Sequence, residues 1–101
     1  MAFLRAVRKD EVPPGTIREL QIDGKVFALA NVDGQFYAIN NTCLHRGGPL
    51  GQGVMEGKNV TCPWHGWEYD VTTGKVCMNA SVGVECYAVE VRGDDLFVDV
   101  G

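Results

Sequence analysis

The chain has 101 residues, a formal net charge of −4 and 46% hydrophobic residues. This length supports one domain with one core but no second catalytic module. A mildly acidic chain does not suit nucleic-acid binding, which calls for a basic patch, but it suits partners with basic surface patches. No apolar run has the length of a signal peptide or a membrane span, so the sequence predicts a cytoplasmic protein with no membrane partner.

The first 40 residues predict short antiparallel strands joined by tight turns. Alternating apolar and polar residues place these strands at 3–8, 16–22, 25–31 and 35–40. Asp23-Gly24 and Asp33-Gly34 are the expected hairpin turns, because Asp-Gly favours a two-residue turn between strands. Prolines keep the loop at 9–15 out of the strand ladder. The predicted arrangement is an antiparallel meander.

The remainder of the chain predicts more strands of the same kind. They are expected at 54–55, 60–61, 67–70, 75–77, 85–92 and 96–100. The strand at 85–92 carries Tyr87, Val89 and Val91 at a spacing of two residues. The last two strands are expected to complete the base sheet or barrel begun by residues 3–40. No helix with caps and apolar periodicity is predicted.

The two histidines of the chain and two of its four cysteines form one pattern. Cys43 and His45 are separated by one residue, sixteen residues follow, and Cys62 and His65 are separated by two. Both pairs are expected at hairpin tips, so strand pairing would bring them to one point. We interpret these four side chains as the ligands of a single metal centre.

The other two cysteines, Cys77 and Cys86, fit no ligand spacing. Their expected role is packing, since a cysteine outside a metal site usually behaves as a small buried hydrophobe. A disulfide between them would be unusual in a cytosolic protein.

Two metal centres are compatible with this ligand set. Two thiolates and two imidazoles can hold a tetrahedral zinc ion, but zinc sites usually place cysteine with cysteine and histidine with histidine. In a binuclear iron–sulfur cluster the two irons lie side by side, so each loop can send its cysteine to one iron and its histidine to the other. The alternating order of ligands favours the [2Fe-2S] cluster.

The two loops resemble those of the Rieske family. The resemblance is carried by Cys-Leu-His-Arg-Gly-Gly-Pro-Leu at 43–50 and Cys-Pro-Trp-His-Gly-Trp-Glu-Tyr-Asp at 62–70. It implies an all-β fold of residues 1–101, with an antiparallel sandwich or barrel base (about 1–40 and 81–101) and a small rubredoxin-like cluster-binding subdomain (about 41–80). It also implies that the two cysteines ligate an inner iron and the two histidines an outer, more exposed one.

The family has several branches, and the sequence excludes some of them. The loops are also similar to those of ring-hydroxylating oxygenase large subunits, which need a second iron on two histidines and a carboxylate. No histidine remains here to build that site. The respiratory and photosynthetic branch has two further cysteines that form a disulfide, at the positions of Gly48 and Trp64 in this chain.

The resemblance therefore implies an electron carrier with no substrate chemistry of its own. We expect a ferredoxin that passes single electrons from a flavin-dependent reductase to a terminal oxygenase. One alternative is the small Rieske subunit of an assimilatory nitrite reductase or a similar complex, and another is a zinc-bound structural module.

The loop residues also predict a low reduction potential for a Rieske centre. By the resemblance, Trp67 replaces a serine that donates a hydrogen bond to a cluster sulfide, whereas Tyr69 keeps the place of a tyrosine that can bond a ligand sulfur. Fewer donors to the sulfurs lower the potential. A redox titration should place the midpoint in the lower part of the Rieske range of about −150 to +300 mV, nearer −150 mV. A midpoint above about +150 mV would contradict the role assigned to Trp67.

Overall fold

The computed structural model describes residues 3–44, 47–64 and 66–100. Within these ranges three antiparallel sheets account for nearly all regular structure, and no helix is long and apolar enough to cross a membrane. The strands are β1 (Phe3–Arg8), β2 (Ile17–Ile22), β3 (Lys25–Val32), β4 (Gln35–Asn40), β5 (Val54–Glu56), β6 (Asn59–Thr61), β7 (Glu68–Asp70), β8 (Lys75–Val76), β9 (Asn79–Gly83), β10 (Cys86–Tyr87), β11 (Val89–Arg92) and β12 (Asp95–Asp99). Two single 3₁₀ turns are η1 (Lys9–Glu11) and η2 (Leu50–Gln52). The predicted all-β antiparallel fold is confirmed.

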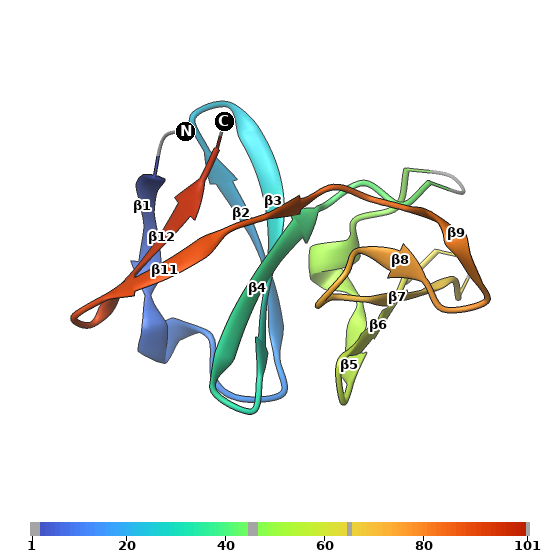
Figure 1. Cartoon of the computed structure of the whole chain (residues 1–101), viewed down its shortest axis with the longest axis horizontal. Coiled ribbons are helices and arrows are strands. Elements are labelled where there is room, and N and C mark those ends of the chain that lie inside the picture. Colours follow the sequence, from blue (N-terminus) through green and yellow to red (C-terminus); the bar gives the residue numbers. More distant parts are fainter. Residues whose placement is uncertain (1–2, 45–46, 65, 101) are drawn as a thin grey trace.

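The base of the molecule consists of two sheets packed face to face. One has the strand order β10-β4-β3-β2 and the other β1-β12-β11 (Figure 1). The predicted Asp-Gly turns join β2 to β3 and β3 to β4, and Asp23 and Asp33 both have positive φ, at 51° and 52°. Positive φ at both central residues is what a type I′ turn requires. The core between the sheets contains Val7, Val12, Ile22, Phe27, Leu29, Ala38, Leu96, Val98 and Val100.

The central strand β3 is buried on both faces. Phe27 and Leu29 point into the core of the base, whereas Ala28 and Ala30 point to the other side of the sheet. All four side chains are at most 1% exposed. Because neighbouring side chains of a strand point to opposite faces, β3 belongs to two cores at once. The four-stranded sheet is thus the middle layer of the molecule.

The outer layer is the small five-stranded sheet β5-β6-β7-β8-β9, which follows the first candidate ligand loop (Figure 1). It shares a core with the middle sheet, formed by Ala28, Ala30, Ile39, Cys43, Leu50, Val60, Cys62, Tyr69, Val71 and Val76. Both candidate cysteine ligands therefore belong to the packing that joins the two layers.

The predicted strand at 85–92 is wrong as a single element. β10 pairs with β4, placing Cys86 opposite Ile39, whereas β11 pairs with β12 in the other base sheet. Ala88 lies between them, and its carbonyl accepts a hydrogen bond from Asp99 N–H. The chain changes sheets here because one short strand cannot pair with both β4 and β12. Val91 is consequently exposed rather than core-facing.

One strand was not predicted from the sequence. β9 has the sequence Asn-Ala-Ser-Val-Gly, whose residues mostly have low strand propensity. It forms the edge of the small sheet and pairs with β8 across a register shift between Lys75 and Val76. Its strand character comes from pairing with β8 rather than from local sequence.

A polar cluster anchors the first ligand loop to the base. Asn41 Nδ2 donates to Glu19 Oε2 at 2.6 Å, and Gln52 Nε2 donates to Glu19 Oε1 at 3.2 Å. Gly51 N–H in turn donates to Asn41 Oδ1 at 2.7 Å. Residues before and after the loop are thus both fixed to one carboxylate on β2.

The close approach of Gly51 to Glu19 gives a stability prediction. A Cβ on Gly51 would lie 2.6 Å from Glu19 Cα and 2.8 Å from Asn41 Oδ1. Gly51→Ala should lower the free energy of unfolding by about 1–3 kcal/mol, because neither the backbone nor the buried amide can move away freely. Chemical denaturation measures this loss. Gln52→Ala, which removes only an exposed hydrogen bond, serves as the control and should cost less than about 1 kcal/mol.

Candidate metal centre

The first candidate loop turns back on itself at a glycine. It follows β4 and is closed by a bridge between Thr42 and Pro49. Cys43 N–H donates to the Gly48 carbonyl at 2.9 Å, and Gly47 N–H donates to the Cys43 carbonyl at 2.8 Å. Gly47 has φ +72°, a conformation that favours glycine.

The second loop, between β6 and β7, repeats this backbone pattern. Cys62 N–H donates to the Trp67 carbonyl at 2.7 Å, and Gly66 N–H donates to the Cys62 carbonyl at 3.1 Å. Gly66 has φ +77°. In both loops the cysteine bonds to the fourth and fifth residues after it. The two cysteines are therefore presented by turns of the same construction.

The two loops meet at Gly48. A Cβ built on Gly48 would lie 2.8 Å from Cys62 Sγ, so only a glycine fits between the first loop and the second cysteine. Cys43 and Cys62 are each 2% exposed and belong to the same core. The fold thus brings both thiols to one buried place, as the sequence predicted.

Gly48 also lies against Trp64. A Cβ on Gly48 would be 3.0 Å from Trp64 Cγ. These are the two positions at which the respiratory branch was expected to carry its disulfide. In this chain an aromatic ring packs on a glycine at these two positions.

Tyr69 holds the first loop by its hydroxyl group. Tyr69 Oη lies 3.3 Å from Cys43 Sγ, and Leu44 N–H donates to the same oxygen at 2.9 Å. Because the oxygen already accepts from Leu44, its own proton can be donated to the sulfur when that sulfur is a thiolate. The structure thus shows Tyr69 in contact with the Cys43 sulfur, a candidate ligand.

The surroundings of Tyr69 keep its hydroxyl protonated. Burial raises the pKa of Tyr69 most strongly, and the hydrogen bond with Cys43 raises it further. Negative charge on Cys43 and Cys62 adds to the increase, whereas the Leu44 N–H lowers the pKa. The net effect is a large rise, so Tyr69 remains a donor at neutral pH.

The other two ligand candidates, His45 and His65, lie outside the described residues. Among the residues that the structure describes, no group of three or more histidine, cysteine or acidic side chains is placed to hold a metal ion. The described part of the site nevertheless fits a cluster that needs two sulfur ligands from the protein. It has two buried thiols, two turns of the same construction, and space between the loops at Gly48.

Cys77 and Cys86 are not packed in the core, contrary to the expectation from sequence. Both are exposed free thiols. Burial of part of each side chain raises both pKa values, and Glu68 and Asp70 raise that of Cys77 further. Protonated surface thiols are poor metal ligands.

Comparison with known proteins identifies the class of this metal centre. The family model of the Rieske [2Fe-2S] domain matches residues 2–88. The chain belongs to this family and carries one [2Fe-2S] cluster, which makes the zinc alternative wrong.

Similar proteins further define the chain as a ferredoxin, which is an electron carrier rather than a catalytic subunit. It is 40% identical to the 3-phenylpropionate/cinnamic acid dioxygenase ferredoxin subunit of Escherichia coli O139:H28, over 89% of this chain and 86% of the relative. It is 31% identical to the naphthalene 1,2-dioxygenase ferredoxin component of Pseudomonas aeruginosa, over 97% of this chain and 95% of the relative.

Solved structures show the same fold in two settings. The ferredoxin of carbazole 1,9a-dioxygenase from Nocardioides aromaticivorans has a TM-score of 0.88 at 28% identity, covering 97% of each chain. A complex of reduced oxygenase and oxidized ferredoxin in carbazole 1,9a-dioxygenase gives 0.86 at 32% identity, covering 95% of this chain and 91% of that one. The terminal oxygenase from the same Nocardioides species gives 0.87 at 26% identity, but there the match covers only 30% of its chain.

The hydrogen bond of Tyr69 gives a prediction about the reduction potential. Tyr69→Phe should lower the midpoint by tens of millivolts, because a bond to a sulfur becomes stronger when the cluster gains an electron. A bond to a charged group contributes about 1.5–3 kcal/mol, and 59 mV corresponds to about 1.4 kcal/mol for one electron. A redox titration measures the shift. An unchanged midpoint would show that the hydroxyl only fixes Leu44.

Proposed function

We propose that Cys43, His45, Cys62 and His65 hold the cluster, with the cysteines on the buried iron and the histidines on the outer one. The burial of both thiols supports the first half of this assignment. Leu44, Gly47, Trp64 and Gly66, which flank the histidines in sequence, are all exposed, and this supports the second half. When bound, the cluster accepts and releases one electron at a time.

The residues around the thiols hold the cluster site rather than perform chemistry. Tyr69 donates to the Cys43 sulfur, and Gly48 leaves the space between the loops open. The small sheet and the middle sheet exclude water from the inner side. The same division supports the proposed subdomains, a cluster-binding part near 41–80 and a base from the remaining residues.

We further propose that the chain carries electrons from a flavin-dependent reductase to a terminal oxygenase. The observation that carries this proposal is the pair of matched loops, which gather both thiols beneath an exposed tip at one end of the molecule. A hollow of about 550 Å³ opens beside Cys43, between Leu44 and the segment Gly83–Glu85, and leaves the first loop approachable. The relatives named above are components of oxygenase systems, which favours an oxygenase over a nitrite reductase as the partner.

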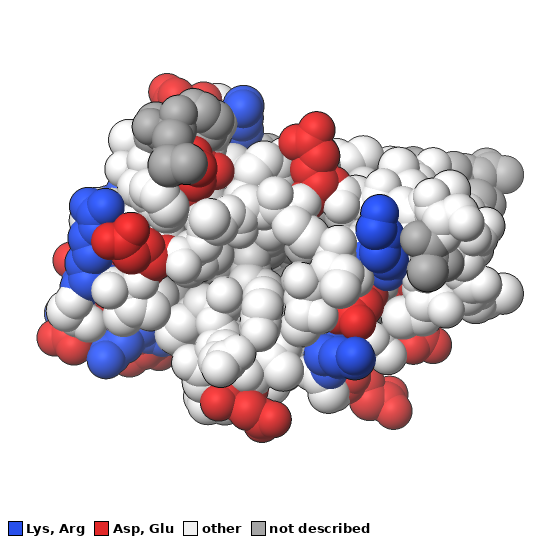
Figure 2. Space-filling view, viewed as in Figure 1, with Lys and Arg blue, Asp and Glu red and all other residues white. Residues whose placement is uncertain are grey.

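The charge distribution suits docking by this end. Figure 2 shows many charged side chains around the β1 side of this face and fewer, among the residues that it colours, toward the opposite end. The exposed apolar side chains Leu44 and Trp64 can be desolvated in a complex at lower cost than charged ones. The free thiols Cys77 and Cys86 support a reducing, cytoplasmic location.

Ligand variants test the assignment of the cluster. Ala replacements at Cys43 and Cys62 should abolish iron binding, whereas His45→Ala and His65→Ala should lose the EPR signal of mixed histidine and cysteine ligation after dithionite reduction. Cys77→Ser and Cys86→Ser are matched controls and should keep both the iron and the signal. Loss of the cluster in a control, iron retained in a cysteine variant, or an unchanged EPR signal in a histidine variant would contradict the assignment.

A further inference from the structure

Asn41 closes the base of the first candidate ligand loop with both its backbone and its side chain. Its carbonyl accepts a hydrogen bond from Leu50 N–H at 2.8 Å, and its Oδ1 accepts one from Gly51 N–H at 2.7 Å. Residues 42–49, which include Cys43, therefore form a closed loop whose two ends are joined at one asparagine.

The same side chain is also fixed to the base of the molecule. Asn41 Nδ2 donates to Glu19 Oε2 at 2.6 Å, and the other oxygen of Glu19 accepts from Gln52 Nε2 at 3.2 Å. Asn41 is only 7% exposed, so its amide relies on partners from the protein rather than on bulk water. These hydrogen bonds of Glu19, Asn41, Gly51 and Gln52 are called the Asn41 network below.

The turn η2 extends this constraint to the second ligand loop. It lies between the middle sheet and the small sheet (Figure 1). Leu50, its first residue, is fully buried in the core that contains both candidate cysteines. At its other end, a Cβ on Gly53 would overlap the carbonyl oxygen of Thr61, the residue before Cys62. One short turn is thus tied to Asn41 on one side and lies against the second loop on the other.

A cluster that takes one sulfur from each loop depends on the separation of the two loops. Ligands of a metal site need to be held within about 0.5 Å of their productive positions by the residues behind them. The hydroxyl of Tyr69 holds the first loop from the small sheet. The Asn41 network holds the same loop from the base, through its backbone rather than through the sulfur.

We propose that Asn41 is a positioning residue for the iron–sulfur centre. It keeps Cys43 in place relative to Cys62 and thereby slows release of the cluster. Loss of its hydrogen bonds would leave the two ends of the first loop free to separate, so that Cys43 could move away from the second loop. The proposal rests on the assignment of both cysteines as ligands.

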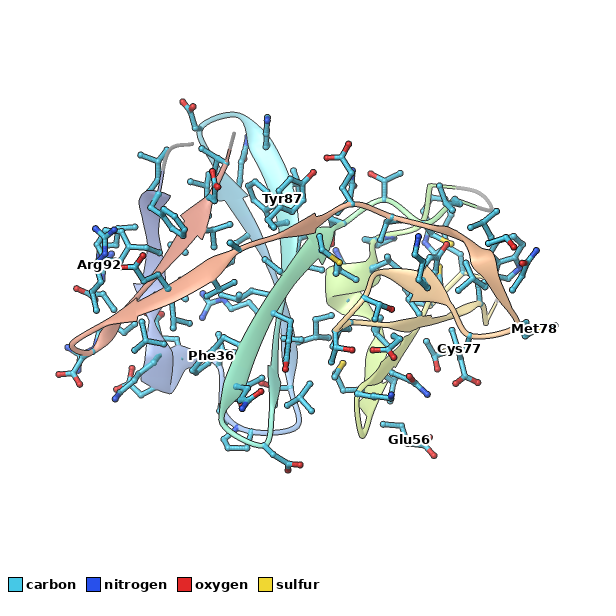
Figure 3. The ribbon with its side chains drawn as sticks, viewed as in Figure 1. Phe36, Glu56, Cys77, Met78, Tyr87 and Arg92 are labelled. Carbon is cyan, nitrogen blue, oxygen red and sulfur yellow. The ribbon has the colours of Figure 1, made fainter. Side chains whose placement is uncertain are left out.

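The chain contains a matched control for this role at Asn31. Asn31 Nδ2 donates to the Val12 carbonyl at 2.7 Å, and its Oδ1 accepts from Gly34 N–H at 2.7 Å. Asn31 is 3% exposed and lies opposite Phe36 in the pairing of β3 with β4. Figure 3 shows Phe36 on the β1 side of β4, away from the small sheet. Asn31→Ala therefore removes bonds of the same kind as Asn41→Ala, but away from the ligand loops.

The rate of cluster release tests the proposal in the oxidised holoprotein. Loss of cluster absorbance is followed with an iron chelator in excess. Asn41→Ala should release the cluster at least about five-fold faster than the wild-type chain, a factor equal to about one net hydrogen bond. Asn31→Ala should stay within about two-fold of the wild type, because release then follows local opening of the loop rather than global unfolding. Equal acceleration in both variants would show that Asn41 only stabilises the fold, and would overturn the proposal.

An exchange of donor and acceptor identifies the hydrogen bond responsible. Asn41→Asp places a carboxylate against that of Glu19 and should accelerate release as Asn41→Ala does. When it is combined with Glu19→Gln, the new amide can donate to the new carboxylate and still accept from Gln52, at unchanged net charge. The double variant should return to within about two-fold of the wild-type rate. A double variant as fast as Asn41→Asp would contradict the proposal.

Two measurements separate positioning from general stability. Hydrogen exchange measured by mass spectrometry should be faster at residues 50–53 in Asn41→Ala and unchanged there in Asn31→Ala. The EPR signal of the reduced protein should broaden only in Asn41→Ala, because its first loop would adopt more than one position. Wild-type exchange at 50–53, or a wild-type EPR line width in Asn41→Ala, would overturn the proposal.

Failure of this proposal can be distinguished from failure of the ligand assignment. If Cys43→Ala or Cys62→Ala keeps the iron, the assignment fails and the positioning role fails with it. If both cysteine variants lose the iron while Asn41→Ala releases the cluster no faster than Asn31→Ala, the assignment stands and only the positioning role fails.

Discussion

The close approach of the two ligand loops at Gly48 is the constraint on which the rest of the structure depends. No side chain fits between the first loop and Cys62 Sγ, so the loops can meet only where one of them has a bare backbone. Tyr69 then ties the first loop to the small sheet through Cys43 and Leu44. The strands on either side hold these two turns in contact, and both cysteines belong to the shared core of the middle and outer layers.

Among the described residues, most ion pairs lie on the base, whereas the most exposed apolar side chains lie in the cluster loops and the small sheet. The ion pairs satisfy the charges locally and add little to stability. The cluster end instead exposes Leu44, Trp64 and Met78. A surface of this kind associates weakly through apolar contact. Weak contact suits an electron carrier, which must leave its partner after each transfer.

Much of this architecture could be predicted from the sequence because its signals are local. Asp-Gly turns need positive φ and a fixed loop length, so Asp23 and Asp33 specified the meander directly. The spacing of Cys43, His45, Cys62 and His65 favoured a cluster over a single ion, and the family match confirms the cluster. What could not be predicted depends on tertiary pairing. The edge strand β9 lacks strand propensity, and the division of 85–92 between two sheets follows only from the closure of the base. The hydrogen bonds around Asn41 join β2 to η2, which no short pattern reveals.

The pairing of β1 with β12 brings both ends of the chain to the base (Figure 1). Either terminus can therefore be extended without covering the candidate ligand loops, where we propose that electrons enter and leave. A fold of this design can be a separate electron carrier or one part of a longer polypeptide. Its match to 30% of a terminal oxygenase chain illustrates the second case. For the same reason, attachment to an electrode through either end would leave the redox-active side facing solution.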